Sequence, residues 1–316
     1  MQKITAAIQE AAKKLLSEGK VDLVVGFSEG TLPLRGTPCF IRKAEDVSLL
    51  TWNYGCENNL ANYLRNKSEK IAVVAKGCDT RAIVALMKEN QINRDNLYII
   101  GIPCSGMIDR NKVAEVTDGR DITDAEANGD VIVLKGQDFS VEANLNDLYH
   151  DTCQTCGFGT PVIYDELIGE PVPAKESNFD DVAAFEALPA LERNKIIAQD
   201  LSKCIRCYAC RNVCPMCYCN ECFVDCSSPQ WIGKAPNTSD NIMFQAVRVL
   251  HLAGRCVDCG ACDRACPMGI NLRGLTRKMV KEVKAMFNFE AGIDLEAKPA
   301  LADYSVDDPE TFLVKE

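Results

Sequence analysis

Residues 204–215 read CIRCYACRNVCP, and residues 256–267 read CVDCGACDRACP. The two segments match position by position at a constant offset, since 256 − 204 = 52. Both have the spacing C-x2-C-x2-C-x3-C-P. Duplication of one module is the simplest origin of two such copies. The repeat therefore predicts a domain built around cysteines in the second half of the chain.

The spacing of each copy is the one that bacterial ferredoxins use to bind 4Fe-4S clusters. Three thiolates at three-residue steps can surround one face of a cubane, and the proline stops the backbone from continuing its turn. The fourth thiolate comes from the other copy. One expected cluster therefore takes Cys204, Cys207, Cys210 and Cys266, and the other takes Cys256, Cys259, Cys262 and Cys214. Zinc is the alternative, but it usually takes two C-x2-C pairs separated by a loop.

The segment between the two copies carries four more cysteines, which are Cys217, Cys219, Cys222 and Cys226. Four thiols within ten positions are too many for chance core cysteines. We expect a third metal site here, with another iron-sulfur cluster as the first choice. Two alternatives stay open: a zinc site, or a mixed arrangement in which one of these cysteines replaces a motif ligand. A helix is expected from Asp240 to Leu252.

The first half of the chain has the pattern of an α/β domain. Short apolar runs at 21–25, 71–75 and 97–102 have the length and composition of strands. A helical stretch at 81–88 lies between the last two, which gives a strand-helix-strand unit and predicts a parallel sheet. Residues 4–17 repeat apolar side chains at the helical period and end at Gly19, as an amphipathic helix does.

The expected fold class is therefore α/β. An N-terminal parallel-sheet domain with flanking helices occupies residues 1–164, and an α+β ferredoxin-like dicluster domain with the inserted cysteines occupies residues 201–290. Between them, residues 165–200 form an acidic linker with nine acidic and three basic side chains. We interpret this linker as a solvated connector, with a docking surface as the alternative. Residues 291–316 form a tail to which we assign no function.

The first half has cysteines of its own. Cys78 and Cys104 each follow an apolar run, so both fall on the carboxyl edge of the expected sheet, where doubly wound folds bind ligands. Cys153 and Cys156 form a C-x2-C pair on a glycine-bearing loop, and Cys56 opens another expected helix. We expect a four-thiolate site made by Cys78, Cys104, Cys153 and Cys156, with Cys56 as the first substitute. Separate buried cysteines are the alternative.

Composition narrows the classes of partner and compartment. The chain has 316 residues, 18 of them cysteines, and a net charge of -10, which disfavours nucleic acid and anionic lipid surfaces. No run of about 18 apolar residues is present, and residues 1–17 lack the apolar core of a secretory signal. We therefore expect a cytoplasmic protein without membrane insertion, whose thiolates bind metal in a reducing environment. The two histidines, His150 and His251, have no ligand-like spacing and are expected to be structural.

Two further segments carry a family resemblance. Residues 76–82 read KGCDTRA and residues 101–106 read GIPCSG. Together with the doubled cysteine motif, they resemble the beta subunits of coenzyme F420 (deazaflavin) hydrogenases and formate dehydrogenases. That resemblance implies iron-sulfur clusters, usually FAD, and electron transfer between a large catalytic subunit and a two-electron carrier. The chain has no G-x-G-x-x-G, so no flavin fingerprint can be traced.

These patterns predict an iron-sulfur electron-transfer subunit of an anaerobic multisubunit oxidoreductase. A formate dehydrogenase, a hydrogenase or a heterodisulfide-reductase-like complex would be the host. Electrons would pass between a partner catalytic subunit and a flavin or soluble carrier, with ferredoxin or the deazaflavin coenzyme as candidate carriers. Two alternatives remain: a self-contained FAD-dependent carrier oxidoreductase, and a metal-stapled interaction scaffold without a redox role.

Overall fold

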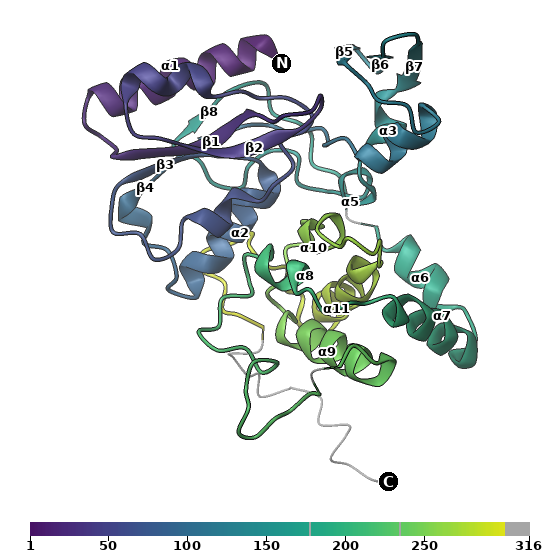
Figure 1. Cartoon of the computed structure of the whole chain (residues 1–316). Helices are drawn as coiled ribbons and strands as arrows, with labels where there is room; N and C mark the ends of the chain where they lie inside the picture. Colours follow the sequence, from purple (N-terminus) through teal and green to yellow (C-terminus); the bar gives the residue numbers. More distant parts are fainter. Residues whose placement is uncertain (177, 234, 301–316) are drawn as a thin grey trace.

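The computed structural model describes residues 1–176, 178–233 and 235–300. Figure 1 shows a sheet-containing half above a helical half that carries most of the cysteines. The expected tail lies outside the described residues from position 301 onward. No helix in the described ranges is long and apolar enough to cross a membrane.

The main sheet has five strands in the order β2-β1-β3-β4-β8. Their bounds are Leu23–Glu29 (β1), Gly36–Ile41 (β2), Ile71–Ala75 (β3), Leu97–Gly101 (β4) and Glu166–Leu167 (β8). Strands β1, β3, β4 and β8 are mutually parallel, and only β2 runs antiparallel, to β1. The α/β class and the three expected strands are confirmed. The sequence did not reveal β2, because it is half-exposed and carries Pro38, which is typical of an edge strand.

Helices cover both faces of this sheet (Figure 1). Helix α1 (Gln2–Ser17) buries Ile8, Ala11, Ala12 and Leu15 on one face. Helix α2 (Gly77–Lys88) covers the other face and begins four residues earlier than expected, which places Cys78 in its first turn. The chain also contains three short 3-10 helices: η1 (Ala44–Leu49), η2 (Leu60–Tyr63) and η3 (Arg94–Asn96). Helix η1 packs against α1, and η2 packs against α2.

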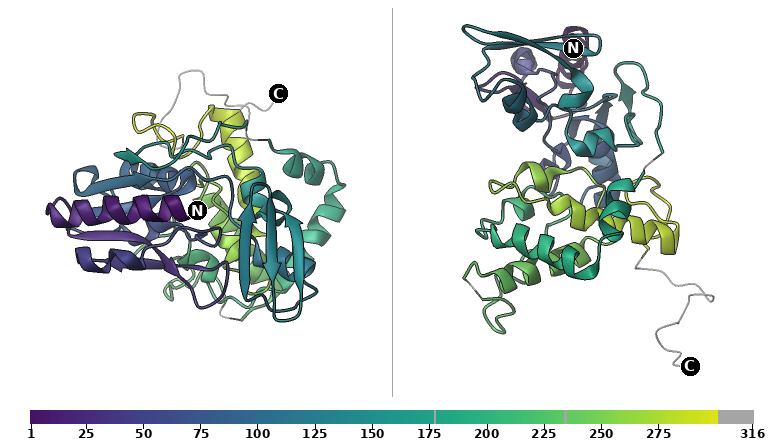
Figure 2. Two further views of the ribbon diagram at one scale, coloured as in Figure 1. Left: turned by 90° about the horizontal axis from the view of Figure 1, so that it is seen from above. Right: turned by 90° about the vertical axis from the view of Figure 1, so that its right-hand side faces the viewer.

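A small antiparallel sheet stands to one side of the main sheet (Figure 2). It consists of β5 (Asp124–Asn128), β6 (Val131–Lys135) and β7 (Ser140–Asn144). Helices α3 (Arg110–Val116) and α4 (Leu145–Leu148) pack on it around a separate apolar core that includes Ile132 and Leu134. The chain then returns to the main sheet through α5 (Asp151–Gln154), which carries Cys153.

The cysteine-rich half is helical. It contains α7 (Ala190–Ser202), α8 (Ala209–Asn212), α9 (Thr238–His251), α10 (Ala261–Arg264) and α11 (Leu272–Phe287). The helix expected at Asp240–Leu252 is α9. The α+β description of this half is corrected, since the described residues after Leu167 include no strand. Left-handed residues near the cysteines turn the backbone away from the extended conformation that a strand needs.

The segment 165–200 is more structured than a simple connector. It contributes β8 to the main sheet and forms α6 (Asp180–Glu186) before entering α7. Two of its acids bind basic side chains of α11: Asp181 pairs with Arg277, and Glu186 pairs with Lys278 and Lys281. Part of its negative charge is therefore used within the chain itself.

Candidate metal centres

The two cysteine motifs adopt the same local structure. Left-handed backbone occurs at Arg206 (φ 57°) and Tyr208 (φ 60°) in the first copy. It recurs 52 positions later, at Asp258 (φ 53°) and Gly260 (φ 69°). Each pair is followed by a one-turn helix, α8 or α10, at the same offset. Because three of the four positions are not glycine, the conformation is imposed by the fold around the cysteines.

The second motif and one cysteine of the first motif surround a common cavity. Its lining includes Cys214, Cys256, Cys259 and Cys262, which is one complete ligand set expected from the sequence. The backbone N–H of Asp258 donates to Cys256 Sγ at 3.4 Å. Burial raises the pKa of the Cys256 thiol to about 12. Metal binding at such protonated thiols must release protons.

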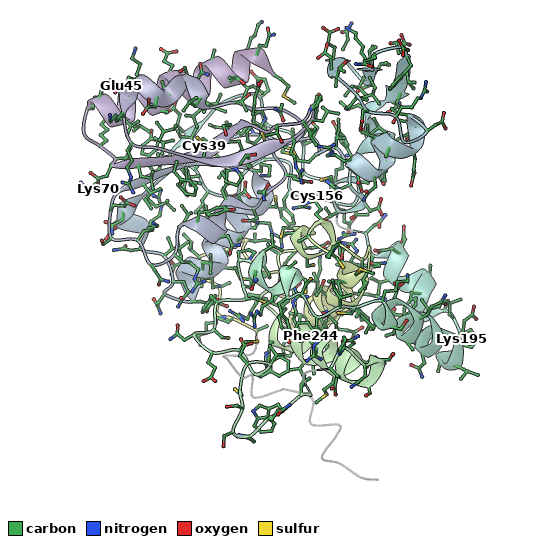
Figure 3. The ribbon with its side chains drawn as sticks, in the orientation of Figure 1. Cys39, Glu45, Lys70, Cys156, Lys195 and Phe244 are labelled. Carbon is green, nitrogen blue, oxygen red and sulfur yellow. The ribbon has the colours of Figure 1, made fainter. Side chains whose placement is uncertain are left out.

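The other expected set lies nearer the surface. Cys204, Cys210 and Cys266 belong to the apolar cluster that contains Phe244. Figure 3 shows Phe244 in the helical half of the molecule. Burial raises the pKa of the Cys210 thiol, and Gln245 Nε2 donates to its Sγ at 3.9 Å. Cys207 is exposed. A cluster held by this set would therefore have one ligand facing solvent.

The burial and hydrogen bonding of Arg248 indicate whether these sites fit an anionic metal-sulfur group. This α9 residue is 3 % exposed and lines the cavity of the second motif. Its Nη2 donates to the carbonyl oxygen of Cys210 at 3.2 Å, whereas Nε and Nη1 have no partner of ordinary hydrogen-bond geometry among the described residues. A side-chain hydrogen bond from Arg248 lowers the pKa of Cys217. A buried guanidinium with open donors is costly unless a negative group faces it. Thiolate-ligated clusters supply negative charge, so the residues present fit them.

The cysteines are spread over several places in the structure. Within residues 1–176, 178–233 and 235–300, no three Cys, His, Asp or Glu side chains converge on a point that one metal ion could occupy. Cysteines of the second-motif set, of the insert and of the first domain line three cavities, whereas Cys204, Cys207, Cys210 and Cys266 line none of the three. The preference for iron-sulfur clusters over zinc therefore rests on the spacing of the two motifs.

A separate cavity of about 150 Å³ lies at the carboxyl edge of the main sheet. Its lining includes Cys78, Cys104, Cys153 and Cys156, the set expected for the first domain. Figure 3 shows Cys156 at the junction between the two halves of the molecule. The approach of α2 to the loop at 157–160 requires Gly77, since a Cβ there would overlap the carbonyl oxygen of Phe158.

Burial governs the chemistry of these four thiols. It raises the pKa of Cys104 to about 12 and also raises the pKa values of Cys78 and Cys153. Backbone N–H groups already donate to sulfur, from Met107 to Cys153 Sγ and from Phe158 to Cys156 Sγ, each at 3.4 Å. Such donors stabilise a thiolate, as a metal ligand requires.

Cys56 is not brought into this cavity. It is fully buried, and its Sγ accepts from the backbone N–H of Asn53 at 3.4 Å. Gly36 passes so close to it that a Cβ would lie 3.0 Å from its Sγ. The helix expected after Cys56 is only the four-residue η2, which begins at Leu60. Burial raises the pKa of Cys56 to about 11, which favours the neutral thiol.

Sequence reasoning missed the charged residues around the first-domain cavity. Lys76 is 2 % exposed, and its Nζ lies 2.9 Å from Asp79 Oδ2 and donates to the carbonyl oxygen of Asn58 at 2.9 Å. Glu57 and Arg264 also line the cavity. A lysine directly after an apolar strand and two residues before a cysteine was the available signal for Lys76. No sequence signal singled out Glu57 or Arg264.

His150 has a more specific environment than the sequence indicated. Its Nε2 lies 2.8 Å from Glu57 Oε2, and its Nδ1 lies 3.3 Å from Asp109 Oδ2. Burial works against the charged imidazolium. Hydrogen bonds that the imidazole donates to Asp109 and Glu57 outweigh burial and raise the pKa of His150 overall. The histidine thus connects Glu57, in a wall of the cavity, to Asp109.

Several hydrogen bonds join the first-domain cavity to the second motif. Thr152 Oγ1 donates to the carbonyl oxygen of Asp258 at 2.8 Å, and Arg273 Nη2 donates to Thr155 Oγ1 at 2.7 Å. Arg264 Nη1 donates to the carbonyl oxygen of Cys259 at 2.8 Å. Cys259 lines both cavities. The two sulfur-lined cavities are therefore neighbours with a common wall.

The inserted cysteines surround a third cavity, of about 220 Å³. Cys217, Cys219 and Cys222 line it, whereas Cys226 does not. Cys217 also forms a side-chain hydrogen bond with Cys214, which lowers the pKa of Cys217 and raises that of Cys214. The insert is thus in direct contact with the ligand set of the second motif.

Two family models match the chain. Residues 68–177 match the model for the C-terminal part of the beta subunit of coenzyme F420 hydrogenase/dehydrogenase. Residues 203–271 match a 4Fe-4S dicluster domain. The first match covers β3, β4 and the cysteine-lined cavity, and the second covers both cysteine motifs and the insert.

Two relatives match the chain over nearly its full length. The chain is 26% identical to the F420-dependent formate dehydrogenase subunit beta of Methanocaldococcus jannaschii, with 93% of each chain covered. It is 28% identical to the F420-dependent formate dehydrogenase 1 subunit beta of Methanococcus maripaludis. That alignment covers 93% of this chain and 92% of the Methanococcus protein.

Among solved structures, one similar chain is in the F420-reducing [NiFe] hydrogenase complex from Methanosarcina barkeri. The match has 13% identity and a TM-score of 0.38, and it covers 49% of this chain and 58% of that chain. The chain is therefore similar to the coenzyme F420 hydrogenase/dehydrogenase beta-subunit model in residues 68–177 and to a 4Fe-4S dicluster domain in residues 203–271.

Proposed function

We propose that this chain is an electron-transfer subunit of an oxidoreductase complex, with one functional unit in residues 1–164 and another in residues 201–290. The observation that carries the proposal is the continuity of the sulfur-lined cavities. The first-domain cavity shares Cys259 with the cavity of the second motif, and Arg248 connects the latter to Cys210 of the first motif. A bound 4Fe-4S cluster supplies single-electron chemistry at each set.

The protein holds these sites in a fixed order. The first-domain cavity lies at the sheet edge, the second motif lies directly against it, and the first motif lies beyond, where Cys207 is exposed. Arg273 and Arg264 fix the middle of this order by binding both halves of the molecule. The exposed Cys207 marks one end at which a partner could exchange electrons.

The relatives suggest which partners exchange electrons with the first and last sites of the series. Both curated relatives are beta subunits of F420-dependent formate dehydrogenases and match this chain over nearly its full length. We infer a partner catalytic subunit of the formate dehydrogenase type, with hydrogenase or heterodisulfide-reductase-like complexes as the other hosts. A deazaflavin coenzyme or ferredoxin is the inferred soluble carrier. We also infer a cytoplasmic location, because a reducing compartment keeps thiolate ligands from forming disulfides.

We assign FAD to neither of the two larger cavities at the edges of the sheet. At about 150 Å³, the cavity at the carboxyl edge is below the range of roughly 300–1,000 Å³ that small-molecule sites occupy. A larger groove of about 760 Å³ is lined by residues such as Lys67, Ser68 and Arg94, which precede β3 and β4. It therefore lies at the amino edge of the strands, opposite the edge that binds ligands in open α/β sheets. We assign the two-electron chemistry to partner subunits.

A potentiometric titration of the anaerobically purified chain, followed by electron paramagnetic resonance, tests the function. We expect several one-electron signals to appear at the negative potentials typical of ferredoxin clusters. Cys259→Ser should remove or alter one of them, whereas Cys39→Ser in the edge strand β2 should change none. Clusters that stay unreduced throughout would favour a metal-stapled scaffold. Stoichiometric FAD in an acid extract would favour the self-contained flavoenzyme.

A further inference from the structure

The insert between the two motifs is built as a binding site in its own right. Its cavity of about 220 Å³ is lined by three of its four cysteines. The fourth, Cys226, does not line the cavity, and its Sγ donates to the carbonyl oxygen of Cys222 at 3.6 Å. All four therefore belong to one ten-residue loop, and three already face the same space.

The loop is fixed to the first domain through a residue between two of its cysteines. Tyr218 Oη donates to Glu89 Oε2 at 2.6 Å, and Arg65 Nη2 donates to the carbonyl oxygen of Tyr218 at 3.3 Å. Arg255 also binds Glu89, through Nε at 2.5 Å and Nη2 at 2.8 Å. Anchoring of this kind holds ligands in place before a metal arrives, which reduces the entropy lost on binding.

An incompletely paired cation faces this cavity. Arg248 lines the cavity of the insert as well as that of the second motif, and it is 3 % exposed. Two of its nitrogens, Nε and Nη1, have no acceptor of ordinary hydrogen-bond geometry among the described residues, and the Arg248 side chain also forms a hydrogen bond with Cys217. Its positive charge acts on Cys217 of the insert and on Cys214 of the motif. The cavity thus presents thiols and an incompletely satisfied positive charge to whatever fills it.

We propose that Cys217, Cys219, Cys222 and Cys226 bind a third iron-sulfur cluster, with Arg248 as the cation shared between it and the cluster of the second motif. Thiolate ligands and a guanidinium with open donors together suit an anionic metal-sulfur group. The inference rests on the proposed electron-transfer function only for the role of this cluster, because the site itself is argued from the insert. In that role, the third cluster would exchange electrons with the cluster of the second motif from a position beside the main series of sites.

Thiol protection in the native chain tests the proposal without any substitution. The anaerobic protein is treated with iodoacetamide before and after iron removal by a chelator, and the modified cysteines are located by peptide mass spectrometry. Cys219 is exposed in the structure, so it should react rapidly when no metal holds it. We expect Cys219 and Cys222 to be protected before iron removal and modified after it. Cys39 is the control and should react equally in both samples.

Metal analysis separates the remaining outcomes. The double variant Cys219→Ser/Cys222→Ser should lose about four irons and four sulfides per chain, as one cubane holds. Unchanged iron, or rapid modification of Cys219 before iron removal, would overturn the proposal. Loss of one zinc in place of iron would also overturn it. If Cys256 and Cys262 stay protected while Cys219 does not, the third site fails and the electron-transfer function stands. If all of them react, both fail.

Discussion

His150 lies next to the first-domain cavity although no sequence motif singles it out. Its imidazole lies between Glu57, which lines the first-domain cavity, and Asp109. The raised pKa of His150 means that folding favours the protonated form. The resulting stabilisation is complete below the unfolded pKa of about 6.5 and is lost as the pH rises through the folded value.

We therefore predict that the free energy of unfolding of the intact chain falls as the pH is raised from 6 toward 7.5, a range below the ionisation of unfolded cysteine thiols. His150→Leu should remove this dependence and cost roughly 2–4 kcal/mol at pH 6, because two carboxylates lose their partner. Denaturant unfolding at several pH values measures both effects. Glu57 and Asp109 have lowered pKa values, so their contribution to the free energy of unfolding is lost only in more acidic solution. It therefore does not overlap with the pH range in which His150 titrates. An unchanged pH profile in the variant would contradict the assignment.

Arg248 carries a prediction about redox potentials. Removing its charge should make the neighbouring cluster harder to reduce, because the reduced cluster carries one more negative charge. Arg248→Gln should shift the potential of the second-motif cluster downward by roughly 60 mV, which is a tenfold change in a one-electron equilibrium. Arg248→Lys retains the charge and is the matched control. Electron paramagnetic resonance titration measures the shift, and equal potentials in wild type and Arg248→Gln would refute it.

At the scale of elements, the start of α2 positions the first-domain cavity. Gly77 allows the loop at 157–160 to approach Cys78, since any Cβ there would overlap the carbonyl oxygen of Phe158. Gly77→Ala should separate Cys78 from Cys156 and remove about four irons per chain. Gly19→Ala, where a Cβ would meet nothing within 4 Å, should leave the iron content unchanged. Full iron retention by Gly77→Ala would show that this cavity holds no cluster.

The contact between α11 and the second motif is a second element-level prediction. Asp258 binds Arg273, with Nε at 2.6 Å and Nη2 at 2.8 Å, and also binds Arg277. All three side chains are largely buried, so Asp258→Asn should cost about 3–5 kcal/mol. Asparagine tolerates the left-handed backbone at this position, so the substitution isolates the charge.

The control for that prediction is an exposed pair of similar geometry. Arg42 binds Glu69 through two nitrogens at the surface, and Glu69→Gln should cost much less than Asp258→Asn because solvent screens the exposed pair. Thermal unfolding of both variants gives the comparison. Equal losses in the two would mean that α11 and the second motif are not coupled through Asp258.

The elements also show where sequence reasoning succeeds. Strands β3 and β4 were predictable because every residue of β3 is buried and both read as continuous apolar runs. Strands β5 and β7 could not be found in this way, because most of their side chains are exposed and polar. Strand β8 has only two residues, so it has no periodicity to read.

At the scale of the whole molecule, spacing predicted which cysteines share a cavity but not how the cavities meet. Cys78, Cys104, Cys153 and Cys156 line one cavity as expected, because two adjacent parallel strands end at one edge. The contact of that cavity with Cys259 depends on Thr152, Arg264 and Arg273, which come from separate segments of the chain. Such long-range contacts leave no local pattern in a single sequence.

The count of iron and acid-labile sulfide per chain, in protein prepared without oxygen, tests the central claim most directly. Four cysteine sets that each hold a cubane predict about 16 irons and about 16 sulfides. About 8 of each would restrict the clusters to the two repeated motifs and would contradict the continuous series of sites that reaches the sheet edge. A chain that contains metal but no inorganic sulfide would contradict the whole account.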